Sequence, residues 1–202
     1  MSSHILIALA VEDDLSEAVL KKILEDRYVV GYCYKQGGFG YLKRTIHGFN
    51  NASKGMPYLV LTDLDRVECA PKLIKEWLPI PIHHNLLFRV AVREVETWVL
   101  ADRDRFAKFV GIQKALVPVD VDAINDPKEC LINLANRSRK RELRDDIVPI
   151  ERSTAKQGPN YNGRLISFVE EFWNPHEAMH NSPSLERTIK VMEKFRPKWE
   201  ER

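Results

Sequence analysis

The sequence predicts an α/β protein with a mostly parallel sheet flanked by helices, and three observations support this prediction. Several short apolar runs are rich in strand-forming residues and too brief for typical core helices, which is typical of buried parallel strands. Amphipathic segments separate these runs, as right-handed strand–helix–strand crossovers require. The 202 residues are 44% hydrophobic and 30% charged, which favours a buried core beneath a well-solvated surface.

Strands and helices are expected to alternate through the first half of the chain. The expected strands span residues 5–11, 28–34, 58–62 and 86–92, the second with a less clear alternation than the others. The expected helices between them span residues 16–26, 37–54 and 67–77. Pro79 and Pro81 end the last of these helices.

From Glu94 onward the pattern is helical. One helix is expected over residues 94–110, ended by Gly111, and two more over 164–173 and 185–195, the last capped by Ser184. We therefore expect one domain over residues 1–202. Its parts are a sheet core (about 1–110), an attached helical lobe (about 111–150) and C-terminal helices (about 151–202).

The composition narrows the cellular setting and the class of partner. The chain has 31 Lys and Arg against 29 Asp and Glu, so its net charge of +2 excludes nucleic-acid binding by overall charge but not by a local patch. No apolar run has the roughly 20 residues of a membrane span, and no signal peptide is evident. Three widely spaced cysteines fit a reducing cytoplasm and lack the paired spacing of a zinc site. A cytoplasmic protein without membrane contact is expected.

Acidic residues directly follow three of the expected strands. They are Glu12, the pair Asp63 and Asp65, and the pair Glu94 and Glu96. The carboxyl ends of parallel strands meet at one edge of a sheet, so these side chains should converge there, and in an extended chain Asp63 and Asp65 project to the same side. Oxygen ligands suit Mg²⁺ or Mn²⁺, so the pattern predicts a metal site. A single acid after a strand is more often a helix cap or a turn residue, and the recurrence after three strands is what favours metal.

The order of these motifs resembles the Toprim (topoisomerase–primase) domain. More narrowly, the chain is similar to small stand-alone Toprim-like proteins related to the OLD-family nucleases of bacterial defence loci. The resemblance covers about residues 4–110, and it is carried by the segments 11–17 (VEDDLSE), 62–65 (TDLD) and 93–102 (REVETWVLAD). One departure is Asp13, which stands where the family usually has a glycine beside the first glutamate.

The resemblance implies divalent-metal-dependent phosphodiester cleavage of nucleic acid, with DNA a better candidate than RNA. It implies Mg²⁺ or Mn²⁺ as cofactor, an ATPase as partner protein and a role in antiphage defence. The residues that would carry this chemistry are Asp63, Asp65 and Glu96 as ligands, Glu12 as ligand or base, Glu94 as a competitor of Glu96 for one position, and Asp102 as a support behind the ligands.

Basic and aromatic residues add weaker signals. Lys156 lies in a polar loop and, given the resemblance, is expected to neutralise the scissile phosphate; otherwise it is an ordinary surface lysine. A local basic stretch could contact phosphates, although such runs are more often solvated helix faces. It consists of Arg137, Arg139, Lys140, Arg141 and Arg144. The four tryptophans, at positions 77, 98, 173 and 199, are expected to be packing residues.

Two other functions stay open at this point. The segment Asp63-Leu64-Asp65 after a strand also fits the nucleophile motif of a haloacid-dehalogenase-like phosphatase, although that motif normally follows the first strand. A non-catalytic regulatory or binding subunit with a degenerate site is the other alternative, because Asp13 replaces the usual glycine. The sequence leaves the oligomeric state open.

Overall fold

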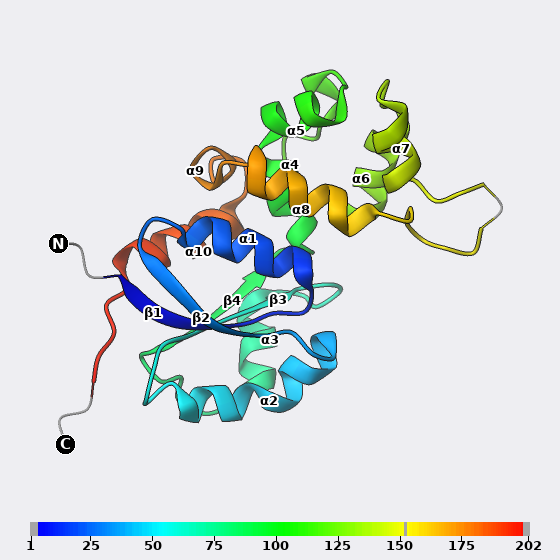
Figure 1. Cartoon of the computed structure of the whole chain (residues 1–202). Coiled ribbons are helices and arrows are strands. Elements are labelled where there is room, and N and C mark those ends of the chain that lie inside the picture. Colours follow the sequence, from blue (N-terminus) through cyan, green and yellow to red (C-terminus); the bar gives the residue numbers. More distant parts are fainter. Residues whose placement is uncertain (1–3, 152, 200–202) are drawn as a thin grey trace.

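The computed structural model describes residues 4–151 and 153–199. Four parallel strands form one sheet in the order β2–β1–β3–β4, which confirms the predicted α/β class (Figure 1). The strands are β1 (Ile5–Ala10), β2 (Tyr28–Tyr34), β3 (Tyr58–Asp63) and β4 (Leu86–Ala91). All four expected strands are therefore present, including the segment from Tyr28 whose alternation is less clear.

Helices cover both faces of the sheet. On one face lie α2 (Gly38–Ala52) and α3 (Ala70–Trp77); on the other lie α1 (Asp14–Leu24) and the helices that follow β4 (Figure 1). Alternation along β1 divides the core accordingly, because Ile7 and Leu9 join the cluster under α1 while Ala8 and Ala10 join the cluster under α2. Both faces of β3 and β4 are buried, as in other parallel sheets, whereas the edge strand β2 is partly exposed.

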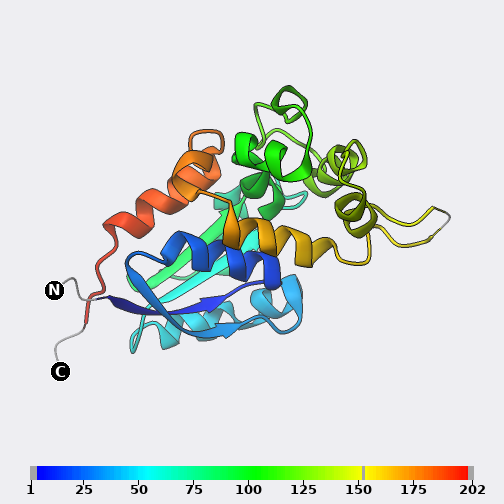
Figure 2. The same cartoon turned by 45° about the horizontal axis from the view of Figure 1, so that its top comes forward.

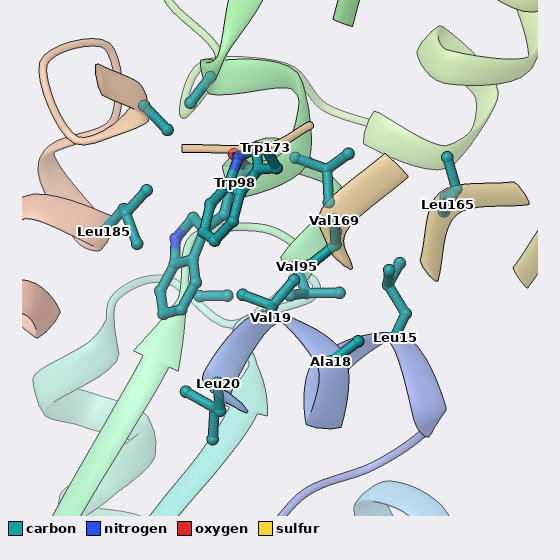
Figure 3. Close-up of a cluster of buried hydrophobic side chains, with 14 of the residues drawn as sticks. Leu15, Ala18, Val19, Leu20, Val95, Trp98, Leu165, Val169, Trp173 and Leu185 are labelled. Carbon is teal, nitrogen blue, oxygen red and sulfur yellow. The ribbon is translucent and has the colours of Figure 1, made fainter. Parts of the chain in front are cut away.

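The second half of the chain is helical. Its elements are α4 (Val95–Ala101), α5 (Arg103–Val110), the 3₁₀ turn η1 (Lys114–Leu116), α6 (Pro127–Asn136), α7 (Arg141–Ile147), α8 (Tyr161–Glu171), α9 (Pro175–Ala178) and α10 (Pro183–Lys194). The region about 111–150, which we call the helical lobe, contains η1, α6 and α7, whereas α8 returns to pack along α1 (Figure 2). Leu165 and Val169 of α8 face Leu15 and Val19 of α1 in this contact (Figure 3).

The single helix expected over residues 94–110 is two helices. The chain breaks at Asp102, whose carboxylate accepts hydrogen bonds from the Arg105 N–H (3.4 Å) and from the Asn174 N–H (2.9 Å). This buried side chain caps α5 and fixes the chain before α9. The start of α10 also differs from expectation, because Ser182 and not Ser184 is its N-cap and Pro183 its first residue.

Three of the four tryptophans are packing residues, as expected. Trp77, Trp98 and Trp173 are 3%, 0% and 1% exposed. The Trp98 indole N–H donates to Ser184 Oγ (2.7 Å), and that of Trp173 donates to the Trp98 carbonyl (3.0 Å), which ties α4 to the C-terminal helices (Figure 3). The expectation is wrong for Trp199, which is 57% exposed. Among the described residues, no helix is both long and apolar enough to cross a bilayer.

Candidate functional site

Glu12 joins the ends of two neighbouring strands. It follows β1, and its Oε1 atom accepts hydrogen bonds from the Thr62 hydroxyl and from the Asp63 N–H (3.0 Å), both at the end of β3. Burial raises the pKa of the Glu12 carboxyl, and the nearby charges of Asp65 and Asp13 raise it further, against the lowering effect of the two hydrogen bonds.

Asp63 lies at the centre of the acidic group. It is the last residue of β3, in register with Ala91 at the end of β4, so its side chain reaches the start of α4. Asp63 Oδ1 accepts a hydrogen bond from the Val95 N–H (2.9 Å), the first N–H of that helix. Burial raises the pKa of the Asp63 carboxyl well above its usual range, with further contributions from the charges of Glu96 and Glu12.

Glu94 and Glu96 both contact Lys128. The sequence predicts that only one of the two enters the site. Glu96 is buried in the first turn of α4, and its Oε1 atom lies 3.6 Å from the Lys128 ammonium and 3.2 Å from the hydroxyl of Tyr161, which donates to it. Glu94 Oε2 accepts from the Lys128 backbone N–H (3.3 Å). Burial, and then the charge of Glu96, raise the pKa of Glu94 to about 7, and burial also raises the pKa of Glu96.

Lys128 and Tyr161 face the carboxylates although neither residue is predicted from the sequence. Lys128 stands in the first turn of α6, whose start is marked by the capping Asp126 and by Pro127. Its ammonium also lies 5.7 Å from the centre of the Tyr161 ring, a cation–π distance. The Asp126-Pro127 capping pattern predicts that a helix starts here. The position of Lys128 beside the carboxylates depends on the packing of the lobe against α4.

One oxygen of each of three carboxylates remains open. All hydrogen bonds to Glu12 reach Oε1, the one to Asp63 reaches Oδ1, and both contacts of Glu96 reach Oε1. In the described chain, no other residue hydrogen-bonds to the second oxygen of these groups. This all-oxygen donor set fits Mg²⁺ or Mn²⁺.

The open oxygens are not arranged as a finished metal cage. Within residues 4–151 and 153–199, no three Asp, Glu, His or Cys side chains stand close enough together to enclose a metal ion. Rotation of the side chains, together with water or substrate oxygens, would have to complete the coordination. Mg²⁺ sites commonly have this form, with one or two carboxylates and several waters.

Asp65 and Asp102 lie outside this arrangement. The strand ends at Asp63, and Asp65 follows in a turn with a left-handed backbone (φ 49°), so the two aspartates do not alternate along one strand as expected. The Asp65 N–H donates to the Arg93 carbonyl (2.8 Å), and the charge of its exposed side chain raises the pKa of Asp63 and of Glu12. The hydrogen bonds of Asp102 go to Arg105 and Asn174, which gives it a structural role.

Lys156 is exposed in the loop between α7 and α8, which projects from the molecule (Figure 1). No hydrogen bond or ion pair in the described chain links it to the carboxylates.

In the basic stretch from Arg137 to Arg144, several side chains make contacts within the protein. Lys140 Nζ donates to the carbonyls of Lys108 (3.1 Å) and Phe109 (2.7 Å) at the end of α5. Arg141 and Arg144 lie 3.4 and 4.0 Å from Asp145, whereas Arg137 and Arg139 are exposed to solvent.

Asp13, the departure from the Toprim-like pattern, has a clear local role. Its side chain accepts a hydrogen bond from the Ser16 N–H (2.8 Å) as the N-cap of α1.

Comparison with known protein families, curated proteins and solved structures finds no match for this chain.

Proposed function

We propose that this protein is a divalent-metal-dependent hydrolase of phosphodiester bonds in nucleic acid. The observation that carries the proposal is the gathering of Glu12, Asp63, Glu94 and Glu96 at the carboxyl edge of the sheet, where burial raises the pKa of all four. Lys128 makes the only ion pair of these carboxylates within the described residues. Ionised together, they leave an excess of negative charge that a divalent cation would neutralise.

Glu12, Asp63 and Glu96 would hold the cation through their open oxygens, with Glu94 beside them. A bound Mg²⁺ or Mn²⁺ would polarise a phosphoryl oxygen as a Lewis acid. The chain's own residues have separate tasks. Thr62 and Tyr161 hold Glu12 and Glu96 in place through their hydroxyl groups. The Lys128 ammonium is positioned to neutralise charge on the phosphate, a task that the sequence analysis gave to Lys156.

The nature of the substrate rests on the Toprim-like order of motifs. That resemblance favours nucleic acid, DNA before RNA, and it alone supports an antiphage role with an ATPase partner. A haloacid-dehalogenase-like phosphatase is less well supported. In that mechanism Asp63 would be the nucleophile, but one of its oxygens accepts from the Val95 N–H. The neighbouring charges that act on it most strongly, those of Glu96 and Glu12, would repel a phosphate.

A non-catalytic binding subunit is the second candidate. It is favoured by the observation that the described carboxylates do not already enclose a metal position. The two candidates differ in one measurable property, since the hydrolase must bind a divalent cation and cleave nucleic acid, whereas the binding subunit cleaves nothing.

Thermal unfolding with added Mg²⁺ or Mn²⁺ tests the site directly. We expect metal to raise the Tm of the wild type by binding only to the folded state. Asp63→Asn should unfold at a higher temperature than the wild type without metal, because one repelling charge is gone, and should lose the response to metal. The matched control is Asp104→Asn, whose exposed carboxylate pairs with Lys114 and which should behave as the wild type.

Cleavage of single- and double-stranded DNA by the same three proteins completes the test. Activity in wild type and Asp104→Asn, lost in Asp63→Asn and on chelation, supports the hydrolase. If ~10 mM metal leaves the Tm of the wild type unchanged and no cleavage occurs, the hydrolase proposal is wrong and the binding subunit takes its place.

A further inference from the structure

A cavity of about 600 Å³ lies at the opposite edge of the sheet from the carboxylates, where the strands begin. Its walls are the end of α2, the loop before β4 and the C-terminal segment after α10. His47, Lys54, His83, Lys198 and Trp199 are among its lining residues. No Asp or Glu is among the described residues that line it. The described walls of the cavity therefore present cationic and polar groups and no carboxylate.

The loop wall of the cavity is held by one buried side chain. Asn50 of α2 accepts a hydrogen bond from the His83 N–H (2.8 Å) through Oδ1 and donates through Nδ2 to the Pro81 carbonyl (3.1 Å). His83 Nδ1 in turn accepts from the Asn85 N–H (3.2 Å), so a neutral His83 ring carries its proton on Nε2 as a donor. This wall is fixed before any ligand arrives.

The C-terminal wall is held by a second buried amide. Asn85 is 0% exposed, and both polar atoms of its side chain bond to the backbone of Lys198, at 2.7 Å to the carbonyl and 2.9 Å from the N–H. The ring of His84 adds a hydrogen bond to the Arg196 carbonyl (3.0 Å). These contacts fix the segment after α10 along the start of β4 and thereby hold Trp199 at the cavity.

Trp199 supplies an exposed aromatic surface. At 57% exposure it differs from the other three tryptophans, which are buried. It also lines a second cavity of about 630 Å³, together with His4, Arg27 and Arg196. An exposed indole among cationic side chains is the arrangement by which proteins stack a nucleic-acid base while binding its phosphate.

We propose that this cavity binds a nucleotide, with the base stacked on Trp199 and the phosphate held by Lys54 and Lys198. The volume lies within the roughly 300–1,000 Å³ of small-molecule sites. The absence of carboxylates among the described lining residues selects an anion, and His83 Nε2 and the Asn51 amide offer donors for base edges or phosphate. The nucleotide is either free or the terminal unit of a single strand. The site is independent of the proposed hydrolase, because it shares no residue with the carboxylate edge.

Fluorescence provides the test, since Trp199 is the solvent-accessible tryptophan. Thymidine 5′-monophosphate and a 5′-phosphorylated single strand of six thymidines are titrated separately into the full chain. We expect saturable quenching, with affinity weakened about tenfold by Lys54→Gln and by Lys198→Gln, as for the loss of a charge-assisted phosphate contact. Lys75→Gln, an exposed lysine of α3 outside the cavity, should bind as the wild type.

Each outcome of these titrations either supports the nucleotide site or overturns it. Saturation by the monophosphate supports a free nucleotide, and saturation by the strand alone supports a strand end. Calorimetry with Trp199→Leu, which removes the reporter, should show weakened binding while circular dichroism shows an intact fold. No saturation by either probe at ~5 mM overturns the proposal. So does binding that the two lysine variants leave unchanged.

Discussion

The ammonium of Lys128 lies 3.6 Å from Oε1 of Glu96, although the two residues belong to different parts of the molecule. Glu96 lies in the first turn of α4, directly after the sheet, and Lys128 lies in the first turn of α6 in the lobe. Tyr161, at the start of α8, donates to the same oxygen. Three helices therefore meet at one buried carboxylate, and the charge balance of the candidate site depends on how the lobe packs.

Removal of Lys128 should destabilise the protein at pH 8. Lys128→Met leaves the Glu96 carboxylate without its cation, and because the lysine side chain is 39% exposed we expect a moderate loss of about 1 kcal/mol, or a Tm lower by about 2–4 °C. At pH 4, where Glu96 is protonated, the difference should vanish. Lys190→Met, which breaks an exposed pair with Glu186, is the control and should change the Tm little. Equal Tm values for Lys128→Met and wild type at pH 8 would show that the pair is energetically neutral.

The same lysine should matter for catalysis more than Lys156. Loss of a positioned charge that stabilises a phosphoryl transition state costs roughly 10²–10³ in rate, so Lys128→Met should lower cleavage by about that factor. Lys156→Met, in the projecting loop, should stay within about twofold of the wild type. The measurement is the rate of DNA cleavage under saturating metal. A reversed order of the two variants would return the catalytic role to Lys156.

Stability of the metal-free protein should fall as the pH rises from about 5 to 8. The pKa of Glu94 is raised to about 7, so the folded state holds this proton more tightly than the unfolded state, whose pKa is near 4.5. The resulting stabilisation is complete below the unfolded pKa and is lost as the pH passes the folded pKa. Glu12, Asp63 and Glu96 shift in the same direction.

Glu94→Gln checks the assignment of this pH dependence. The variant keeps an oxygen that accepts from the Lys128 N–H but carries no charge, so it should be more stable than the wild type at pH 8 by about 1–2 kcal/mol and equal to it near pH 4. Urea unfolding at pH 4 and at pH 8, in the presence of a chelator, measures the free energy of unfolding of the variant and of the wild type. A wild-type free energy of unfolding that rises steadily from pH 5 to 8 would contradict the prediction.

Asp102→Ala should unfold the protein more easily without touching the metal response. The buried carboxylate caps α5 and accepts from the Asn174 N–H, so its removal orphans two backbone donors and costs about 2–3 kcal/mol. Urea unfolding gives the loss of stability, and the Tm increase on adding Mg²⁺ should match that of the wild type. Loss of that increase would place Asp102 behind the ligands, as the Toprim-like pattern implies.

The sequence alone predicts those features that depend on neighbours in the chain. Parallel strands end at a common edge, so the positions of Glu12, Asp63, Glu94 and Glu96 follow from the apolar runs before them. The position of Asp65 does not follow in this way, because the strand ends at Asp63 and the next residues form a turn.

Features set by packing between distant segments are beyond such reasoning. The apolar periodicity runs through Asp102 without interruption, and only the hydrogen bond from Asn174 shows why the helix breaks there. Lys128 and Tyr161 have ordinary surroundings in the sequence, and the fold of the lobe determines that both face Glu96. The exposure of Trp199 likewise depends on Asn85, far away in the chain.

The contacts of Glu96 also imply an order of assembly during synthesis. Glu12, Asp63, Glu94 and Glu96 all leave the ribosome before Lys128, and Lys128 leaves before Tyr161. A nascent chain that ends between residues 96 and 128 carries the full set of carboxylates with neither the cation nor the hydroxyl that face them in the finished protein. In such a chain the carboxylates at the carboxyl edge of the sheet lack the contacts of Lys128 and Tyr161, which the lobe and α8 supply only later.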